Sequence, residues 1–441
     1  MTDPAAQITH LLSTRTVRAQ ANRMLERALE GGTAFEVRME KLDDVARLVA
    51  DVTRDNYPDL RIPYHSRWGH FRAGGIDRGL ELARRLEGLD PIEKARVQFE
   101  LVIPSVLLDA GAGMKWRYKE RESGREYARS EGLAVASYRL FQEGAFSSDR
   151  RNPLRCDSAG LLALSRRRLE EAFQVSGDNP LVGVEGRLHL MHALGRAIRQ
   201  DGPYFQGPAE EHEPGVDSPH GHSIHRLGTI VDYLFSKAVP PAHKGSKRTL
   251  AATTILDAVQ RGLGSIWPGR ESVGEFNLGD VWRYEPFERE IAAENLEEED
   301  RRMQALVPFH KLSQWLSYSL MEPLEAAGLE ITALGDLTGL PEYRNGGLFL
   351  DGGVLALRDP ADALKSHAPG SELVVEWRAL TVALLDRVAP PVRKLLQKTD
   401  ENYPLAKVLE GGTWWAGRKL AAKARPDGGS PLRIESDGTV F

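Results

Sequence analysis

The chain contains almost no cysteine, because Cys156 is the single one among its 441 residues. One thiol cannot form an intramolecular disulfide, and it excludes a zinc knuckle built on cysteines. Disulfide-dependent proteins of oxidising compartments are therefore excluded as a class. We expect a protein of a reducing compartment, the cytoplasm.

Long apolar runs are missing as well. The longest, residues 101–108, is broken by Pro104, whereas a helix that spans a bilayer needs about 20 apolar residues. The first ten residues, MTDPAAQITH, lack the basic and then apolar build of a signal peptide. We expect a soluble protein without a membrane partner.

The chain also lacks an excess of positive charge. It has 58 lysines and arginines and 63 aspartates and glutamates, which gives a formal net charge of -5. A surface that coats nucleic acid needs a basic face. No nucleic-acid partner is therefore expected, although a local basic pocket remains open.

Several catalytic motifs are absent. Neither a G-x-S-x-G nucleophile elbow nor a P-loop occurs, and the Gly-Ala-Gly at 111–113 lacks the strand and helix that a dinucleotide site requires. The basic run 243–248 precedes a predicted helix, so it can bind a phosphate or be only a solvated helix start. We expect no cofactor.

Helical periodicity dominates what is present. Apolar residues recur three and four apart in the segments 5–30, 38–54, 91–107, 127–142, 158–174, 180–200, 223–238, 249–262, 284–305, 309–326 and 371–389. Strand signals are few: 182–188, 348–356 and the tail 431–441, where Asp437-Gly438 favours a hairpin. The sequence predicts a mainly α fold with a small β component.

Two neighbouring segments offer candidates for catalysis. Lys311, Gln314 and Tyr318 fall on one face of the helix predicted at 309–326. Asp336 follows in a glycine-rich loop that can present a carboxylate by its turns. Taken alone, such residues are more often a solvated helix lysine and an ordinary turn residue.

Charged and aromatic residues elsewhere add candidates for binding. Glu376 and Arg378 interrupt an otherwise apolar helix, where a charge needs a partner. Asp109 and Asp280 each precede an aromatic and basic cluster that contains Trp116 or Trp282. Tryptophan beside a carboxylate can hold a flat polar group, although it also serves as a core residue.

The histidines are grouped without a metal-binding spacing. His65 and His70 lie five apart, and His220, His222 and His225 form a second group, but no carboxylate completes either set. The helical pattern of two histidines four apart with a glutamate between them is absent. We therefore expect no metal, while keeping metal binding as the alternative.

Seven segments resemble the uracil-catabolism proteins of fungi and bacteria that act in the route through ribosylurea. They are RIPYHSRWGHFRAGG, VLLDAGAGMKWRY, RSEGLAVAS, NPLVGVEGR, ILDAVQRGLGSIWPGR, LGDVWRY and VPFHKLSQWLSYSLMEP. The order of motifs is also distantly similar to that of the queuosine-salvage nucleoside glycosidases. That similarity implies a single helical domain related to DNA glycosylases at 37–395, with an insertion at about 201–300. A helical extension, 1–36, precedes it, and a helix with a hairpin tail, 396–441, follows it.

The resemblance also implies the site. It gives Asp336, Lys311 and Glu376 catalytic positions. The residues that it and the motifs above suggest for substrate binding are His65, Arg67, His70, Asp109, Trp116, Asp280, Trp282, His310, Gln314, Arg344 and Arg378.

The implied activity is hydrolysis of the N-glycosidic bond of a small ribosyl compound, ribosylurea or its 5-phosphate. Asp336 is expected to stabilise the cationic transition state, and Lys311 to keep that aspartate ionised. Two other classes stay open: a metal-dependent amide or amidine hydrolase that uses the histidines, and a non-catalytic nucleotide-binding regulator. The oligomeric state is left open.

Overall fold

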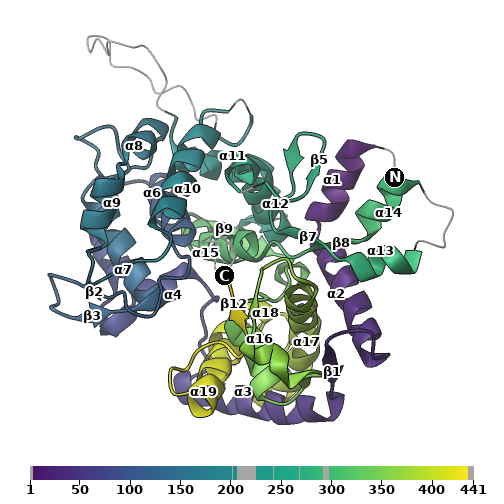
Figure 1. The fold of residues 1–441 in the computed structure, drawn as a ribbon. Coiled ribbons are helices and arrows are strands. Elements are labelled where there is room, and N and C mark those ends of the chain that lie inside the picture. The colour runs from purple at the N-terminus through teal and green to yellow at the C-terminus, as the bar shows by residue number, and fades with distance from the viewer. Residues whose placement is uncertain are drawn as a thin grey trace. The chain divides into compact units, whose positions relative to one another are not determined.

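The computed structural model describes residues 3–200, 202–205, 225–241, 243–267, 269–291 and 297–435. Helices dominate these residues, and their strands form two-stranded pairs (Figure 1). The mainly α class predicted from the periodicity is confirmed. Contacts group the chain into unit 1, residues 1–66, 268–318 and 333–441, and unit 2, residues 67–267 and 319–332.

The described residues of unit 1 form helices and four strand pairs. Its helices are α1 (Pro4–Leu12), α2 (Thr14–Leu29), α3 (Leu42–Asn56), α13 (Glu285–Ile291), α14 (Glu298–Gln304), α16 (Tyr343–Asp351), α17 (Glu372–Leu396), α18 (Leu405–Val408), α19 (Trp414–Ala424) and the first half of α15 (Lys311–Ala326). Its strand pairs are β1 (Phe35–Val37) with β10 (Leu355–Leu357), β5 (Ser272–Val273) with β6 (Phe276–Asn277), β7 (Val281–Arg283) with β8 (Leu306–Pro308), and β11 (Ser366–His367) with β12 (Arg433–Ile434).

Helix α17 forms the core of unit 1. Every residue from Leu373 to Leu385 is buried, so the helix is enclosed on all sides rather than on the one face that its pattern predicted. Helices α2, α3 and α16 pack against it (Figure 1). A helix that is apolar all round belongs in the interior. The two charges on α17, Glu376 and Arg378, are thereby carried into the core and need partners there.

The predicted helix 5–30 is two helices. Ser13 adopts an extended conformation between them, and its hydroxyl accepts a hydrogen bond from the backbone N–H of Thr16 at 3.3 Å. Serine is a preferred residue at a helix start because its side chain satisfies a backbone N–H that the helix leaves unpaired. The chain therefore restarts a helix at Thr14, and α2 continues to Leu29.

Unit 2 is also helical. Its helices are α4 (Arg67–Phe71), α5 (Arg78–Arg85), α6 (Pro91–Leu107), α7 (Arg129–Gln142), α8 (Ser158–Ala163), α9 (Arg166–Ala172), α10 (Val184–Ala197), α11 (Ile230–Lys237), α12 (Ala252–Gly262) and the second half of α15. Strands β2 (Tyr118–Lys119) and β3 (Glu126–Tyr127) pair antiparallel, and β4 (Arg248–Ala251) and β9 (Leu329–Thr332) pair parallel. No helix in the described part of the chain is long and apolar enough to cross a membrane.

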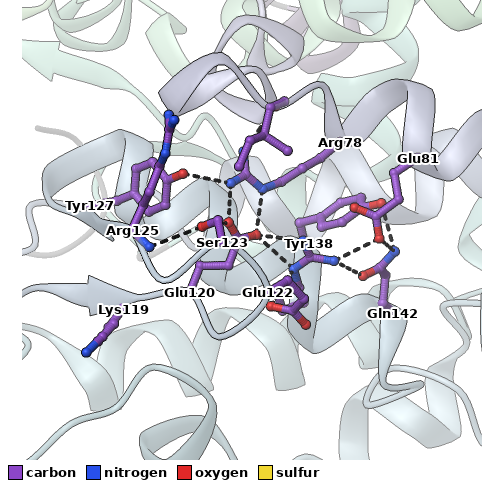
Figure 2. A network of polar contacts seen from close by, with 12 residues as sticks. Arg78, Glu81, Lys119, Glu120, Glu122, Ser123, Arg125, Tyr127, Tyr138 and Gln142 are labelled. Atoms are coloured by element: carbon purple, nitrogen blue, oxygen red, sulfur yellow. Dashed lines mark hydrogen bonds and ion pairs between the residues drawn. The ribbon is translucent and has the colours of Figure 1, made fainter.

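A buried ion network holds the β2–β3 hairpin to α5 and α7 (Figure 2). Glu120, just after β2, accepts two hydrogen bonds from Arg78, at 2.8 and 2.5 Å, and two from Arg139, at 2.9 and 2.7 Å. The side chains of Arg78 and Glu120 have no exposed surface. Burial raises the pKa of Glu120, but the hydrogen bonds from the two arginines and Ser123 outweigh it and lower the pKa to about 2.

Replacing Glu120 by glutamine is expected to lower the free energy of unfolding by about 3–5 kcal/mol, because it leaves buried guanidinium charge uncompensated. The wild-type contribution should be complete above the ordinary glutamate pKa of 4.5 and be lost as the pH falls toward 2. Urea denaturation at several pH values measures both effects. Glu122→Gln is the matched control, since Glu122 is 57% exposed and reaches Arg139 only at 3.4 Å. Equal stability of the two variants would contradict the assignment.

Two predicted strands are wrong. Within 182–188 only a turn precedes α10: Gly183 has a φ of +74°, a left-handed conformation that glycine adopts without strain, and the helix begins at Val184. In 348–356 helix α16 continues to Asp351, and only Leu355 and Ala356 belong to strand β10. The predicted hairpin at Asp437-Gly438 lies outside the described residues.

Candidate functional site

A buried ion pair joins two of the predicted residues in unit 1. Both nitrogens at the end of the Arg378 guanidinium donate to the Asp280 carboxylate, at 2.8 and 2.7 Å. The Trp282 ring N–H donates to the same carboxylate at 2.7 Å, and the backbone N–H of Lys311 donates to it at 3.0 Å. Arg378 also lies over the Phe309 ring, 4.1 Å from its centre. The residues predicted around Asp280 are thus brought together.

Asp280 is a permanent anion in this arrangement. Burial raises its pKa, but the charge and hydrogen bonds of Arg378, with those of Trp282 and the Lys311 backbone, hold the pKa well below the ordinary aspartate range. A group that stays ionised at every physiological pH does not transfer protons. Asp280 instead satisfies the first backbone N–H of α15 and so fixes where Lys311 begins that helix.

The polar face predicted on α15 receives the loop that carries Asp336. Gln314 donates to the Thr338 hydroxyl at 2.7 Å and accepts from the Thr338 N–H at 2.8 Å, and the Tyr318 hydroxyl donates to the Thr338 carbonyl at 2.9 Å. Gln314, Tyr318 and Thr338 are all fully buried. Gln314 therefore anchors the loop, and its described hydrogen bonds are made within the protein rather than toward a ligand.

Asp336 ends a short 3-10 turn, Leu334–Asp336, and it is exposed. Arg18 of α2 holds this turn through its backbone: the guanidinium donates to the carbonyls of Gly335, Asp336 and Leu337 at 2.9, 2.9 and 2.7 Å. The turn is therefore well fixed, but the described contacts of Asp336 are those of its main chain. Its predicted catalytic role stays a prediction.

Glu342 is a residue that the sequence analysis missed. It is half-buried at the start of α16, where its two carboxylate oxygens accept from the backbone N–H groups of Arg344 and Asn345 at 2.7 and 2.5 Å. Each oxygen keeps a second lone pair. In the sequence, a glutamate just after Pro341 has the ordinary explanation of a helix cap. Its position therefore gives no sign of a functional charge.

Lys311 and His65 influence the pKa of the Glu342 carboxyl. Burial raises the pKa of the Glu342 carboxyl above its ordinary value, while the two backbone hydrogen bonds and the charges of Lys311 and His65 act in the opposite direction without cancelling that rise. Lys311 and His65 are thus both within electrostatic reach of the Glu342 carboxylate. A raised carboxyl pKa brings the group closer to neutrality, where it can take up and release a proton.

His65 has a carboxylate partner. Its Nδ1 lies 2.8 Å from one oxygen of Glu410, and the Tyr57 hydroxyl donates to the other oxygen at 2.8 Å. His65 is 8% exposed, and its ring lies 6.4 Å from that of Trp414. Since an ionised carboxylate only accepts hydrogen bonds, the Nδ1 nitrogen carries the proton. Nε2 is then the ring nitrogen left to exchange a proton with a ligand.

Three further predicted residues lie in the interior of unit 1. Glu376 accepts from the Tyr284 hydroxyl at 2.6 Å and from the Ala34 N–H at 2.8 Å. The Nε2 of His310 lies 2.8 Å from the Leu11 carbonyl, and burial lowers the pKa of this histidine. Arg344 donates to the Gly428 carbonyl at 2.7 Å. These contacts join separate segments of the fold, and the predicted site roles of the three residues stay predictions.

The remaining predicted residues belong to unit 2. Arg67 is fully buried and donates to the Asp109 carboxylate and to the Ser105 hydroxyl, at 2.5 and 2.8 Å. Burial lowers the pKa of Arg67, and the Asp109 charge opposes this shift. Arg187 donates to the carbonyls of Leu108 and Ala110, at 2.9 and 2.6 Å, on either side of Asp109. The predicted pair Arg67 and Asp109 is therefore brought together.

Trp116 and His70 differ in their surroundings. Trp116 is fully buried, its ring N–H donates to the Phe173 carbonyl at 2.9 Å, and its ring stacks on that of Phe173. This is the packing of a core residue, the alternative that the sequence left open. His70 is half-buried near the end of α4.

Metal ligands are not gathered in the described part of the chain, where no three histidine, cysteine, aspartate or glutamate side chains could hold an ion together. His220 and His222 lie outside the described residues, and His225 is exposed. The alternative of a metal-dependent hydrolase therefore gains no support from His65 and His70, of which His65 is paired with Glu410.

Comparisons with known proteins place the chain in a family. A family model described as "Protein of unknown function (DUF1688)" matches residues 10–441. The chain is 36% identical over 463 aligned residues to "Uracil catabolism protein 4" of Lachancea kluyveri, covering 100% of this chain and 99% of the relative. It is 37% identical over 444 residues to "Protein urg3" of Schizosaccharomyces pombe, covering 98% of this chain and 99% of that protein.

Proposed function

The chain belongs to the DUF1688 family, and from this membership and the groups around Glu342 we propose that it hydrolyses the N-glycosidic bond of ribosylurea or its 5-phosphate in uracil catabolism. The name of the Lachancea relative supports the pathway. The resemblance of the motifs to proteins of the ribosylurea route supports the substrate. The distant similarity to nucleoside glycosidases supports the type of bond.

The observation that carries the proposal is the Glu342 carboxylate, half-buried at the start of α16 and held there by the backbone N–H groups of Arg344 and Asn345. Cleavage of a ribosyl C–N bond passes through an oxocarbenium-like state, which needs negative charge near the anomeric carbon and a base for the attacking water. Glu342 can meet both needs: its ionised carboxylate supplies the negative charge, and its free lone pairs and a pKa raised by burial suit a base. Lys311, whose charge acts on Glu342, can orient a ribose hydroxyl or a 5-phosphate.

The Asp280–Arg378 pair has a supporting part in this proposal. It fixes the first turn of α15, from which the Lys311 side chain extends. Trp282 is half-buried beside Asp280, and the Arg270 guanidinium lies over its ring, 4.7 Å from the ring centre. Asp336 is kept as a second candidate for the charge-stabilising carboxylate, on a turn that Arg18 holds in place.

The test is a product assay with the purified full chain. Ribosylurea and its 5-phosphate are incubated separately, and urea and free ribose or ribose 5-phosphate are measured. Release of urea and the sugar in equal amounts, unchanged by a chelator, is the expected result. Ammonia release that a chelator abolishes would indicate the metal-dependent amide hydrolase instead. Tight binding of either compound without any product over hours would indicate the non-catalytic regulator.

A further inference from the structure

His65, Glu410 and Tyr57 form a hydrogen-bonded chain that no step above has used. Its members come from three places in unit 1: Tyr57 directly follows α3, His65 lies in the segment after it, and Glu410 lies in a π-helical turn, Leu409–Thr413. The two hydrogen bonds that meet at Glu410 are both 2.8 Å long. The backbone N–H of His65 also donates to the Ala406 carbonyl at 3.0 Å, which fixes the main chain beside the ring.

The sequence builds this arrangement around two glycines. A side chain at Gly412 would put its Cβ 2.5 Å from the Val49 carbonyl oxygen of α3, and one at Gly411 would strike the Tyr403 hydroxyl. The glycines therefore let the π-turn lie directly against α3. A single π-turn inside a helical segment is rare and is frequently found at functional sites. Here it brings the Glu410 carboxylate to both His65 and Tyr57.

The chemistry of the chain is that of an oriented imidazole. Glu410 accepts from Nδ1, which selects one tautomer and stabilises the imidazolium form that a proton donor requires. The Tyr57 hydroxyl occupies the other oxygen of Glu410 and restricts its rotation. Nε2 faces away from the carboxylate on the same ring. His65 is also one of the two side chains whose charge acts on Glu342, so it belongs to the group of residues assigned to the reaction.

We propose that His65 is the general acid that protonates the leaving nitrogen, and that Glu410 is the residue that positions it. The inference rests on the proposed glycosidase function. In the step, the C1′–N bond breaks and its electron pair goes to the urea nitrogen. That nitrogen takes the proton from Nε2, so urea leaves neutral. Water adds its oxygen to C1′ and gives a proton to Glu342, which balances the proton that His65 has lost.

The test compares leaving groups that differ in their need for an acid. Ribosylurea needs protonation, whereas the nitrophenolate of 4-nitrophenyl ribofuranoside leaves as a stable anion. His65→Asn keeps an N–H near the Nδ1 position for Glu410 and removes Nε2. We expect kcat/KM for ribosylurea to fall by roughly a hundredfold or more, while kcat/KM for the nitrophenyl substrate stays within about threefold, the split that loss of a proton donor causes.

Two companion variants separate position from packing. Glu410→Gln is expected to lower kcat on ribosylurea by about tenfold with little change in KM, because it disorients the imidazole without removing it. His192→Gln is the control, since the Nε2 of His192 in unit 2 lies 2.8 Å from the Leu164 carbonyl and a glutamine can replace that contact. It should leave both substrates unaffected.

A pH profile on ribosylurea alone gives a second readout. The pH dependence of the rate should differ between the wild type and His65→Asn, because the variant lacks the proposed proton donor. Glu410 and Tyr57, which form the hydrogen-bonded chain with His65, are present in both proteins, as are Glu342 and Lys311. An equal loss on both substrates, an unchanged rate on both, or an unchanged profile would overturn the inference. A wild-type protein that cleaves neither substrate would instead overturn the proposed function.

Discussion

Replacing Glu342 by glutamine is expected to lower kcat on ribosylurea by roughly a hundredfold or more, the usual loss when a charge that stabilises the transition state is removed. The amide cannot stabilise an oxocarbenium ion or accept a proton from water. It can still accept one backbone N–H bond at the start of α16, so the loss of stability should be about 1 kcal/mol. Steady-state kinetics with a urea assay measures the first effect, and urea denaturation measures the second.

Two control variants make this result specific. Glu342→Asp keeps a good cap and the charge but withdraws the carboxylate by one methylene, so it should fold normally and remain poorly active. Asp336→Asn tests the residue predicted from the resemblance, and its exposed position leads us to expect a loss of less than about tenfold. If Glu342→Gln kept near-normal turnover and Asp336→Asn lost almost all of its turnover, Asp336 rather than Glu342 would be the catalytic carboxylate.

Replacing Arg378 by methionine is expected to lower the free energy of unfolding by about 3–5 kcal/mol, because the Asp280 carboxylate is left buried without its counter-ion. The pair is almost wholly enclosed, with 1% of the Arg378 side chain and 14% of the Asp280 side chain exposed. Chemical denaturation of the wild type and the variant at neutral pH measures the difference.

A double-mutant cycle isolates the pair itself. Asp280→Asn combined with Arg378→Met removes both charges, so the double variant should be more stable than Arg378→Met alone. Arg283→Met serves as the matched control, since Arg283 pairs with Glu288 and its side chain is 49% exposed. That control substitution should lower the free energy of unfolding by less than about 1 kcal/mol. If Arg378→Met lowered the free energy of unfolding no more than the control, the pair would not contribute to stability.

The helices follow from the sequence because their causes are local. The spacing of apolar residues predicted α6 at 91–107, which is where the structure has it. Missed helices such as α4 and α5 are short, and their residues lie in or after a loop rich in glycine and proline. The strand predicted at 182–188 is wrong. The alternation of valine and glycine there looks like a strand, but Gly183 caps the start of helix α10.

The site is only partly predictable because its contacts are long-range. The position of Arg378 on an apolar helix indicates that its charge needs a partner. The sequence does not show that this partner is Asp280, 98 positions away. Gln314 and Tyr318 were correctly placed on one face, yet that face anchors Thr338. Glu342 and Glu410 gave no signal, since a helix cap and a glutamate before two glycines have ordinary explanations. The roles of Lys311 and Asp336 stay predictions.

One measurement tests the central claim most directly. Ribosylurea labelled with carbon-13 at C1′ and at the urea carbonyl is incubated with the full chain and followed by carbon-13 nuclear magnetic resonance. The C1′ signal should move from that of an N-linked carbon to those of free ribose, while the carbonyl signal becomes that of urea at the same rate. The 5-phosphate form is run in parallel and should show the same change if it is the substrate. An intact C1′–N bond in both compounds, with the protein folded and in excess, would contradict the account.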